Sequence, residues 1–149
     1  MFIDIDCTQE KKYNQNTYGD CFMSKRYPEK GELIAVLSDG LGSGIKANIL
    51  ASMTATMLIK FVEAGRSIKR TCEVIMNALP VCKVRKISYS TFSMAQCNED
   101  GDVKIIEEGN PQFVYISDGK VVEPEFTVID SETFKNRLIM FQYLLFFLL

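Results

Sequence analysis

The alternation of apolar and polar residues predicts strands at the start of the chain. Residues 2–6 place three apolar side chains among acidic ones and predict a first strand. Residues 20–27 predict a second strand, and residues 32–38 contain a short apolar run that is typical of a buried strand. Between these two strands, Pro28-Glu29-Lys30-Gly31 has the composition of a tight turn, so we expect a hairpin.

From residue 45 the spacing of the apolar residues changes to that of a helix. Residues 45–64 contain no proline or glycine and predict a long helix, with Ser43 as its N-cap and Gly65 just beyond its end. A second helix is expected over residues 67–79, where Ser67 is the N-cap. The apolar face of the first helix is widened by Leu50, Leu58, Phe61 and Val62, and the helix is therefore predicted to be largely buried. Its apolar repeat of one residue in four consists of Ile45, Ile49, Met53 and Met57.

Beyond residue 88 the period becomes two, which indicates strands joined by short turns. The turn residues are Asn98-Glu99-Asp100-Gly101 and Ser117-Asp118-Gly119. Strands, two helices and a further series of strands together predict an α+β fold in which helices pack on an antiparallel sheet or sandwich. The strands predicted here are residues 89–97, 102–107, 112–116, 120–122 and 126–129.

The C-terminal segment, residues 138–149, is almost entirely apolar and reads LIMFQYLLFFLL. It is too short to cross a bilayer as a helix, which needs ~20 residues. Three interpretations stay open: a buried terminal helix or strand, an anchor on a membrane surface, or a tail outside the domain.

Composition narrows the classes of function. A chain of 149 residues is long enough for one self-sufficient domain, and 47% apolar with 24% charged residues is ordinary for a globular protein. A net charge of −2 argues against nucleic acid as a partner. The chain has no histidine, which excludes histidine-based triads and zinc sites. Its five scattered cysteines, with no C-x-x-C pair, favour a reducing cytoplasm and side chains that mostly fill apolar positions.

One stretch combines features that suit metal and phosphate chemistry. In Ser38-Asp39-Gly40-Leu41-Gly42-Ser43-Gly44 a carboxylate ends a buried strand and glycines lead into a helix N-terminus, which favours anions. The glycine spacing fits neither a Walker A loop nor a dinucleotide fingerprint. The predicted hairpin brings Asp20 near Asp39, and two such carboxylates suit Mg²⁺ or Mn²⁺. The alternative is that both are ordinary turn carboxylates.

At these residues the chain resembles the metal-dependent protein serine/threonine phosphatases of type 2C. Within them it is most similar to the bacterial branch named for stage II sporulation protein E (SpoIIE). The resemblance covers roughly residues 18–125. The matching segments are Gly19-Asp20-Cys21-Phe22, residues 38–44 with Ala47 and Ser52 after them, and Glu108-Gly109-Asn110-Pro111 leading into residues 113–116.

The resemblance implies that Asp20 and Asp39 bind a dinuclear Mn²⁺ or Mg²⁺ centre and that Gly40 contributes its backbone carbonyl. It implies a four-layer αββα sandwich, in which an antiparallel β-sandwich is flanked by helices. The implied reaction is attack of a metal-activated water on a phosphoserine or phosphothreonine, and no histidine is needed. The implied substrate is a regulatory phosphoprotein such as an anti-sigma-factor antagonist.

The resemblance ends before the C-terminus. The family has further metal-binding acids there, and we find no counterpart because Asp118 has the context of a turn residue. The sequence therefore predicts an incomplete phosphatase domain over residues 1–130, lacking its last strands, and an atypical tail over residues 131–149. Three hypotheses follow: a phosphatase, a catalytically impaired phosphatase that acts as a binding or regulatory module, or a membrane-tethered regulator.

Overall fold

The computed structural model describes residues 3–11, 13–14, 16–82, 88–123, 125–130, 135–142 and 146–148. Its first hairpin pairs β1 (Asp20–Tyr27) with β2 (Glu32–Gly40), as the sequence predicts. The turn is a short 3-10 helix, Pro28–Lys30, and Gly31 after it adopts the left-handed conformation with φ 61°.

The strands form two antiparallel sheets. The larger sheet has the order β1-β2-β3-β4-β8-β7, and the smaller sheet has the order β6-β5-β9. The remaining strands are β3 (Ser90–Asn98), β4 (Asp102–Glu108), β5 (Val114–Ser117), β6 (Lys120–Val122), β7 (Phe126–Asp130), β8 (Lys135–Gln142) and β9 (Phe146–Leu148).

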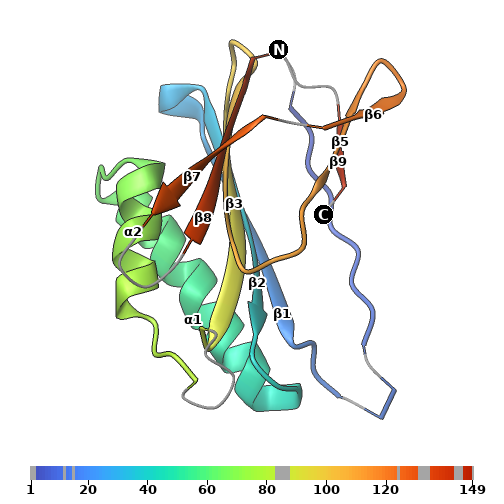
Figure 1. Ribbon diagram of the computed structural model, residues 1–149, viewed down its shortest axis with the longest axis vertical. Helices are drawn as coiled ribbons and strands as arrows, with labels where there is room; N and C mark the ends of the chain where they lie inside the picture. Colours follow the sequence, from blue (N-terminus) through green and yellow to red (C-terminus); the bar gives the residue numbers. More distant parts are fainter. Residues whose placement is uncertain are drawn as a thin grey trace.

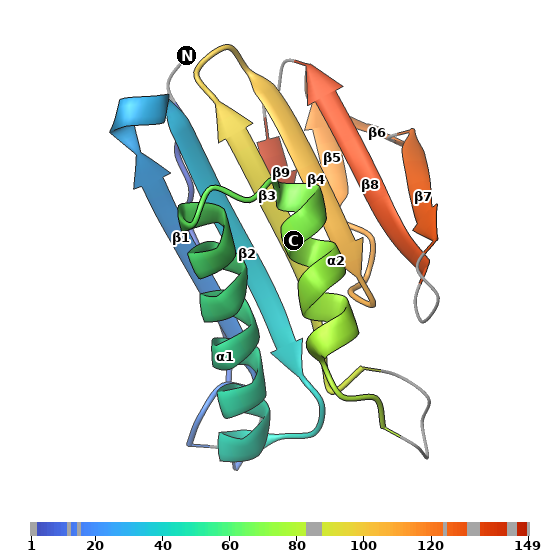
Figure 2. The same cartoon turned by 90° about the vertical axis from the view of Figure 1, so that its left-hand side faces the viewer.

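The helices and the smaller sheet lie on opposite faces of the larger sheet (Figures 1 and 2). Helices α1 (Gly44–Glu63) and α2 (Ile68–Ala78) cover one face and enclose the larger apolar core. On the other face, β5 packs on β3 and β4 through a second core that includes Val103, Ile105 and Tyr115. The α+β class is confirmed. The described residues form three layers, so the second helical layer of the expected αββα sandwich stays a prediction.

The predicted start and end signals of α1 and the predicted start signal of α2 are confirmed. Ser43 is the N-cap residue of α1, and Gly65 follows its end with φ 82°. Ser67 caps α2 by accepting a hydrogen bond from the backbone N–H of Arg70 at 3.3 Å.

The face that α1 buries agrees with the prediction only near the end of the helix, where Leu58 and Val62 are buried. Ile45, Ile49 and Met53 are 68%, 50% and 56% exposed. In the first part of the helix, the small side chains from Ala47 to Ala55 let the helix axis approach the sheet closely, and this contact leaves the larger side chains outside. The buried residues of α1 are Ala47, Ala51, Thr54, Ala55, Leu58, Ile59 and Val62. By length and composition alone α1 could cross a membrane, but core helices pass the same test, and α1 contributes to the core.

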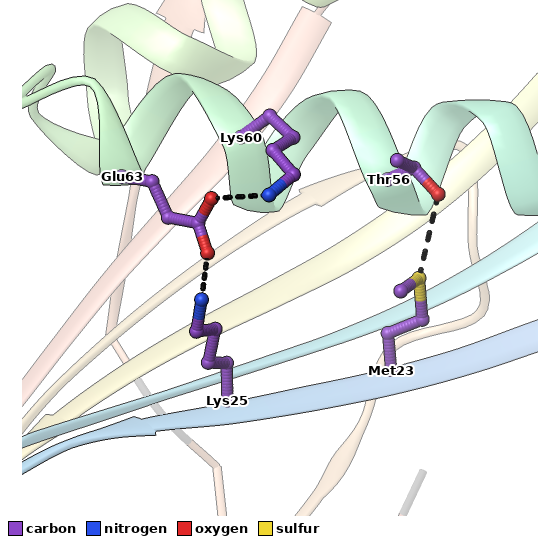
Figure 3. Close-up of polar contacts among 5 residues, drawn as sticks. All are labelled: Met23, Lys25, Thr56, Lys60 and Glu63. Carbon is purple, nitrogen blue, oxygen red and sulfur yellow. Dashed lines mark hydrogen bonds and ion pairs between the residues drawn. The ribbon is translucent and has the colours of Figure 1, made fainter.

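The C-terminal turn of α1 is joined to β1 by charge (Figure 3). Glu63 accepts hydrogen bonds from the ammonium groups of Lys25, on β1, and Lys60, the latter at 2.7 Å. These two bonds lower the pKa of Glu63 to about 2. Along the same contact, the hydroxyl of Thr56 lies 3.7 Å from the sulfur of Met23.

The N-terminal residues do not form the predicted strand. Residues 3–11 have no regular secondary structure and run on the side of the larger sheet that carries the smaller sheet, down toward the end where β1 starts (Figure 1). Met1 and Phe2 lie outside the described residues.

The apolar C-terminal segment contributes to both sheets. β8 pairs with β4 and β7, and β9 pairs with β5. Of the three interpretations of this segment, the backbone pairing agrees with a terminal strand. The division of the chain at residue 130 stays a prediction.

Of the five cysteines, two fill core positions and Cys21 packs against the larger core at partial burial, whereas Cys7 is exposed. All five are free, and Cys72 and Cys97 are 1% and 6% exposed. Burial raises the pKa of the Cys97 thiol to about 11 and raises the pKa of Cys72 further. Neither thiol is therefore a nucleophile at neutral pH.

Candidate metal centre

The two predicted acids lie side by side at the open end of the first hairpin. In the β1–β2 ladder, Asp20 is the direct partner of Asp39. Directly opposed residues on antiparallel strands project from the same face of the sheet, with Cβ atoms about 5 Å apart. Both residues are exposed. The hairpin thus produces the juxtaposition of carboxylates that the sequence predicts.

Gly40 allows the helix to approach these acids. A Cβ atom at Gly40 would lie 1.9 Å from the carbonyl oxygen of Ala47, so this contact admits only glycine. The Gly40 N–H donates to the carbonyl of Gly19 at 3.4 Å, and the N–H of Leu41 donates to Tyr89 at 2.9 Å. The first turn of α1 is therefore held directly against the strand end that carries the metal-site candidates.

A buried hydroxyl network fixes the end of β2. The hydroxyls of Ser38 and Ser90 lie 2.8 Å apart, and Ser90 donates to the carbonyl of Asp39 at 3.1 Å. Ser38 also donates to the carbonyl of Thr91 at 2.9 Å. Sequence reasoning missed Ser90 and Thr91, because only the register that pairs Asp39 with Thr91 brings β3 to the site.

The segment Gly109-Asn110 fixes the neighbouring strand. Asn110 accepts a hydrogen bond from Thr91 at 2.5 Å and donates one to the hydroxyl of Ser93 at 2.9 Å. Gly109 has φ +71°, and a Cβ atom there would lie 2.5 Å from Cγ2 of Thr91. Gly109 and Asn110, which belong to the sequence resemblance, therefore position Thr91, the residue that pairs with Asp39 in the β2–β3 ladder.

A small cavity of about 50 Å³ lies at the paired acids. The side chain of Ser43 makes no capping bond among the described residues, so it leaves the first backbone N–H groups of α1 for another acceptor. Such groups favour an anion such as a phosphoryl group. The residues that line the cavity are Glu10, Thr17, Gly19, Asp20, Asp39, Gly42, Ser43 and Gly44.

The available donors suit a divalent cation. Asp20 and Asp39 supply carboxylate oxygens at the two strand ends, and the backbone of Gly40 adjoins them. Mg²⁺ and Mn²⁺ prefer oxygen ligands of this kind and keep several waters. Within the described part of the chain, no three acidic or thiol side chains are already grouped as a metal site.

Asp118 lies apart from this site. It is in the turn between β5 and β6 with φ 49°, and this turn is at the opposite end of the molecule from the start of β1 (Figure 1). The interpretation of Asp118 as a turn residue is confirmed.

Comparison with known proteins gives structural matches only. No family profile and no curated protein sequence matches the chain. The structure of RsbX in complex with magnesium matches 91% of this chain and 66% of its own length, with a TM-score of 0.67 and 23% identity. The PP2C phosphatase domain of SpoIIE from Bacillus subtilis matches 83% of this chain and 36% of its own, with a TM-score of 0.66 and 23% identity. This chain has the PP2C phosphatase fold.

A third PP2C-like match is the pair of RsbU and RsbW domains of a Mycobacterium tuberculosis protein. It has a TM-score of 0.65 and 18% identity, over 89% of this chain and 38% of the other. The chain thus spans two thirds or less of the solved chains named here. The expected SpoIIE-branch fold is confirmed, and the metal-binding roles of Asp20, Asp39 and Gly40 stay predictions.

Proposed function

We propose that the chain is a Mn²⁺- or Mg²⁺-dependent protein serine/threonine phosphatase domain. The observation that carries this proposal is the direct pairing of Asp20 with Asp39, beside the N-terminus of α1, in a PP2C fold. The RsbX structure with the same fold contains magnesium, which supports a divalent cation as the cofactor.

Asp20, Asp39 and the carbonyl of Gly40 would hold the dinuclear centre. The bound ions would supply activation of water and charge stabilisation for displacement at phosphorus. The chain itself orients the reactants. The N-terminus of α1 attracts the phosphoryl oxygens, and Ser90 holds the carbonyl of Asp39 so that the strand end keeps its place.

The proposed substrate is a phosphoserine or phosphothreonine on a regulatory protein in the cytoplasm, such as an anti-sigma-factor antagonist. A bacterial stressosome structure, with a TM-score of 0.68 and 13% identity, and the RsbU and RsbW domains are consistent with such a protein partner. A catalytically impaired binding module is not favoured, since the matched structures include phosphatase domains.

The test is hydrolysis of p-nitrophenyl phosphate and of a phosphoserine peptide in Mn²⁺. We expect Asp39→Asn to lose at least ~100-fold in kcat/KM, because even groups that only orient a metal ligand contribute 10–100-fold. The matched control is Asp100→Asn, at an exposed turn position between β3 and β4. Wild-type hydrolysis no faster than that of Asp39→Asn would refute the proposed activity.

A further inference from the structure

Strand β1 is a free edge of the larger sheet, because none of the described strands pairs with its outer side (Figure 2). At the open end of the first hairpin, the Gly40 N–H donates to the carbonyl of Gly19. Backbone groups alternate in direction along a strand, so those of Phe22, Ser24 and Arg26 point away from β2. No described residue forms a hydrogen bond with these outward backbone groups. Such a row of donors and acceptors can pair with another strand.

On α1, a row of exposed apolar side chains faces this edge. Ile45, Ile49 and Met53 recur every four residues and are all at least 50% exposed. Thr56 continues the row three residues later, and its hydroxyl contacts the sulfur of Met23 on β1 (Figure 3). The row therefore lies on the side of α1 that faces β1. We call this row, together with the outward backbone groups of residues 22–26, the β1 edge surface.

The N-terminal segment contacts β1 without forming a strand on its edge. The guanidinium of Arg26 donates to the carbonyl of Ile3 at 2.7 Å, and the side-chain amide of Gln9 donates to the carbonyl of Asp20 at 3.5 Å. Both bonds use side-chain donors. Among the described residues, no backbone ladder joins residues 3–11 to β1, and the outward groups of residues 22–26 stay available.

Charge and position indicate what this surface binds. Lys25 and Arg26 of β1 and Lys60 of α1 are exposed. Lys25 and Lys60 share one acid, Glu63, so these four side chains keep a net positive charge that attracts an acidic chain. At its other end the surface reaches the cavity beside the paired acids, because its first apolar residue directly follows Gly44 of the cavity lining. A chain bound along the surface is thus led to the candidate site.

We propose that the β1 edge surface binds an extended acidic segment of the phosphoprotein substrate as an added strand. This inference rests on the proposed phosphatase function. The segment pairs its backbone with the outward groups of β1 and places alternate apolar side chains against Ile49 and Met53. An antiparallel segment then brings its C-terminal end to the N-terminus of α1. Such binding recognises an unfolded stretch of chain next to the phosphorylated residue.

The test uses a synthetic peptide of eight residues, the length of β1, which alternates isoleucine with aspartate and ends in phosphoserine. Calorimetry without Mn²⁺ measures its binding to the full-length chain. We expect Ile49→Gln and Met53→Gln each to weaken binding by about tenfold, since a large apolar contact is lost. The matched control is Val121→Gln, at a 70% exposed position on the smaller sheet, which should bind as the wild type does.

Methylation of the peptide backbone tests the strand pairing without changing the protein. Two further peptides carry methyl groups on alternate amides, one on each of the two sets. Only one set points to β1 in an added strand, and methylation removes its N–H donors and blocks close approach. We expect that peptide to lose at least ~10-fold in affinity and the other to bind as the unmethylated peptide does.

Three results would overturn the docking surface: no binding of the peptide, binding that neither α1 variant weakens, or equal binding of the two methylated peptides. Sedimentation gives a fourth, because a dimer that both α1 variants abolish would show that a second copy covers the surface. Hydrolysis of p-nitrophenyl phosphate is measured separately. Hydrolysis without peptide binding refutes the docking surface and leaves the phosphatase function standing. Peptide binding that meets every expectation, in a chain without hydrolysis, supports the surface and refutes the activity.

Discussion

At the scale of single residues, two glycines beside the site have different reasons to be glycine. At Gly40 the backbone of α1 occupies the place of a side chain. At Gly19 a Cβ atom would meet Cβ of Ala47 at 3.7 Å, which is an ordinary contact. Both positions belong to the sequence resemblance, yet only Gly40 is required by packing.

This difference gives a stability prediction. We expect Gly40→Ala to reduce the free energy of unfolding by about 3 kcal/mol, because the helix must move away from the strand end. Gly19→Ala should change it by less than ~1 kcal/mol. Urea denaturation of both variants measures the difference, and equal losses would show that the contact between Gly40 and Ala47 is not the cause.

At the scale of elements, α1 shows why an apolar period does not by itself choose the buried face. The helix is apolar on more than one side: Ile45, Ile49 and Met53 are exposed, whereas small residues nearer its start and large ones nearer its end are buried. Periodicity locates the helix, whereas the space available against the sheet decides which of its apolar sides is buried.

The orientation of α1 can be tested by two substitutions on opposite faces. Ala51→Leu should cost ~1–3 kcal/mol of unfolding free energy, because Ala51 is fully buried and the added volume must displace the sheet or the helix. Met53→Gln should change stability by no more than about 0.5 kcal/mol, since Met53 is 56% exposed. Thermal or urea unfolding measures both. A large loss for Met53→Gln alone would mean that the predicted apolar repeat is buried after all.

At the scale of the whole molecule, a buried acid makes overall stability depend on pH. Glu108 ends β4 and is 6% exposed, and its Oε2 has no hydrogen-bond partner among the described residues. Burial raises the pKa of Glu108 to about 7. Between pH 4.5 and 7 the folded chain therefore keeps a proton at Glu108 that the unfolded chain has lost, so this residue's contribution to stability falls as pH rises.

Glu108→Gln should remove this dependence, because glutamine stays neutral. We expect the variant to gain about 2 kcal/mol relative to the wild type between pH 5 and pH 8. Unfolding by urea at both pH values measures this gain. The control is Glu99→Gln, at an exposed turn position, which should follow the wild type. A constant difference between Glu108→Gln and the wild type would contradict the prediction.

The sequence by itself determined the order of most elements, their turns and the nearness of Asp20 to Asp39. These features depend on local signals: caps, turn residues, and a hairpin whose two strands are close in the chain. The resemblance to type 2C phosphatases also lies in such local motifs, and the fold agrees with it.

Only the tertiary structure decided which face of α1 is buried, that the apolar C-terminal segment pairs in both sheets, and that Glu10, Ser90 and Thr91 lie at the site. Each of these features is a contact between residues far apart in the chain. The local sequence fixes whether a residue is apolar, acidic or small. Which residues it contacts depends on how elements distant in the chain pack together.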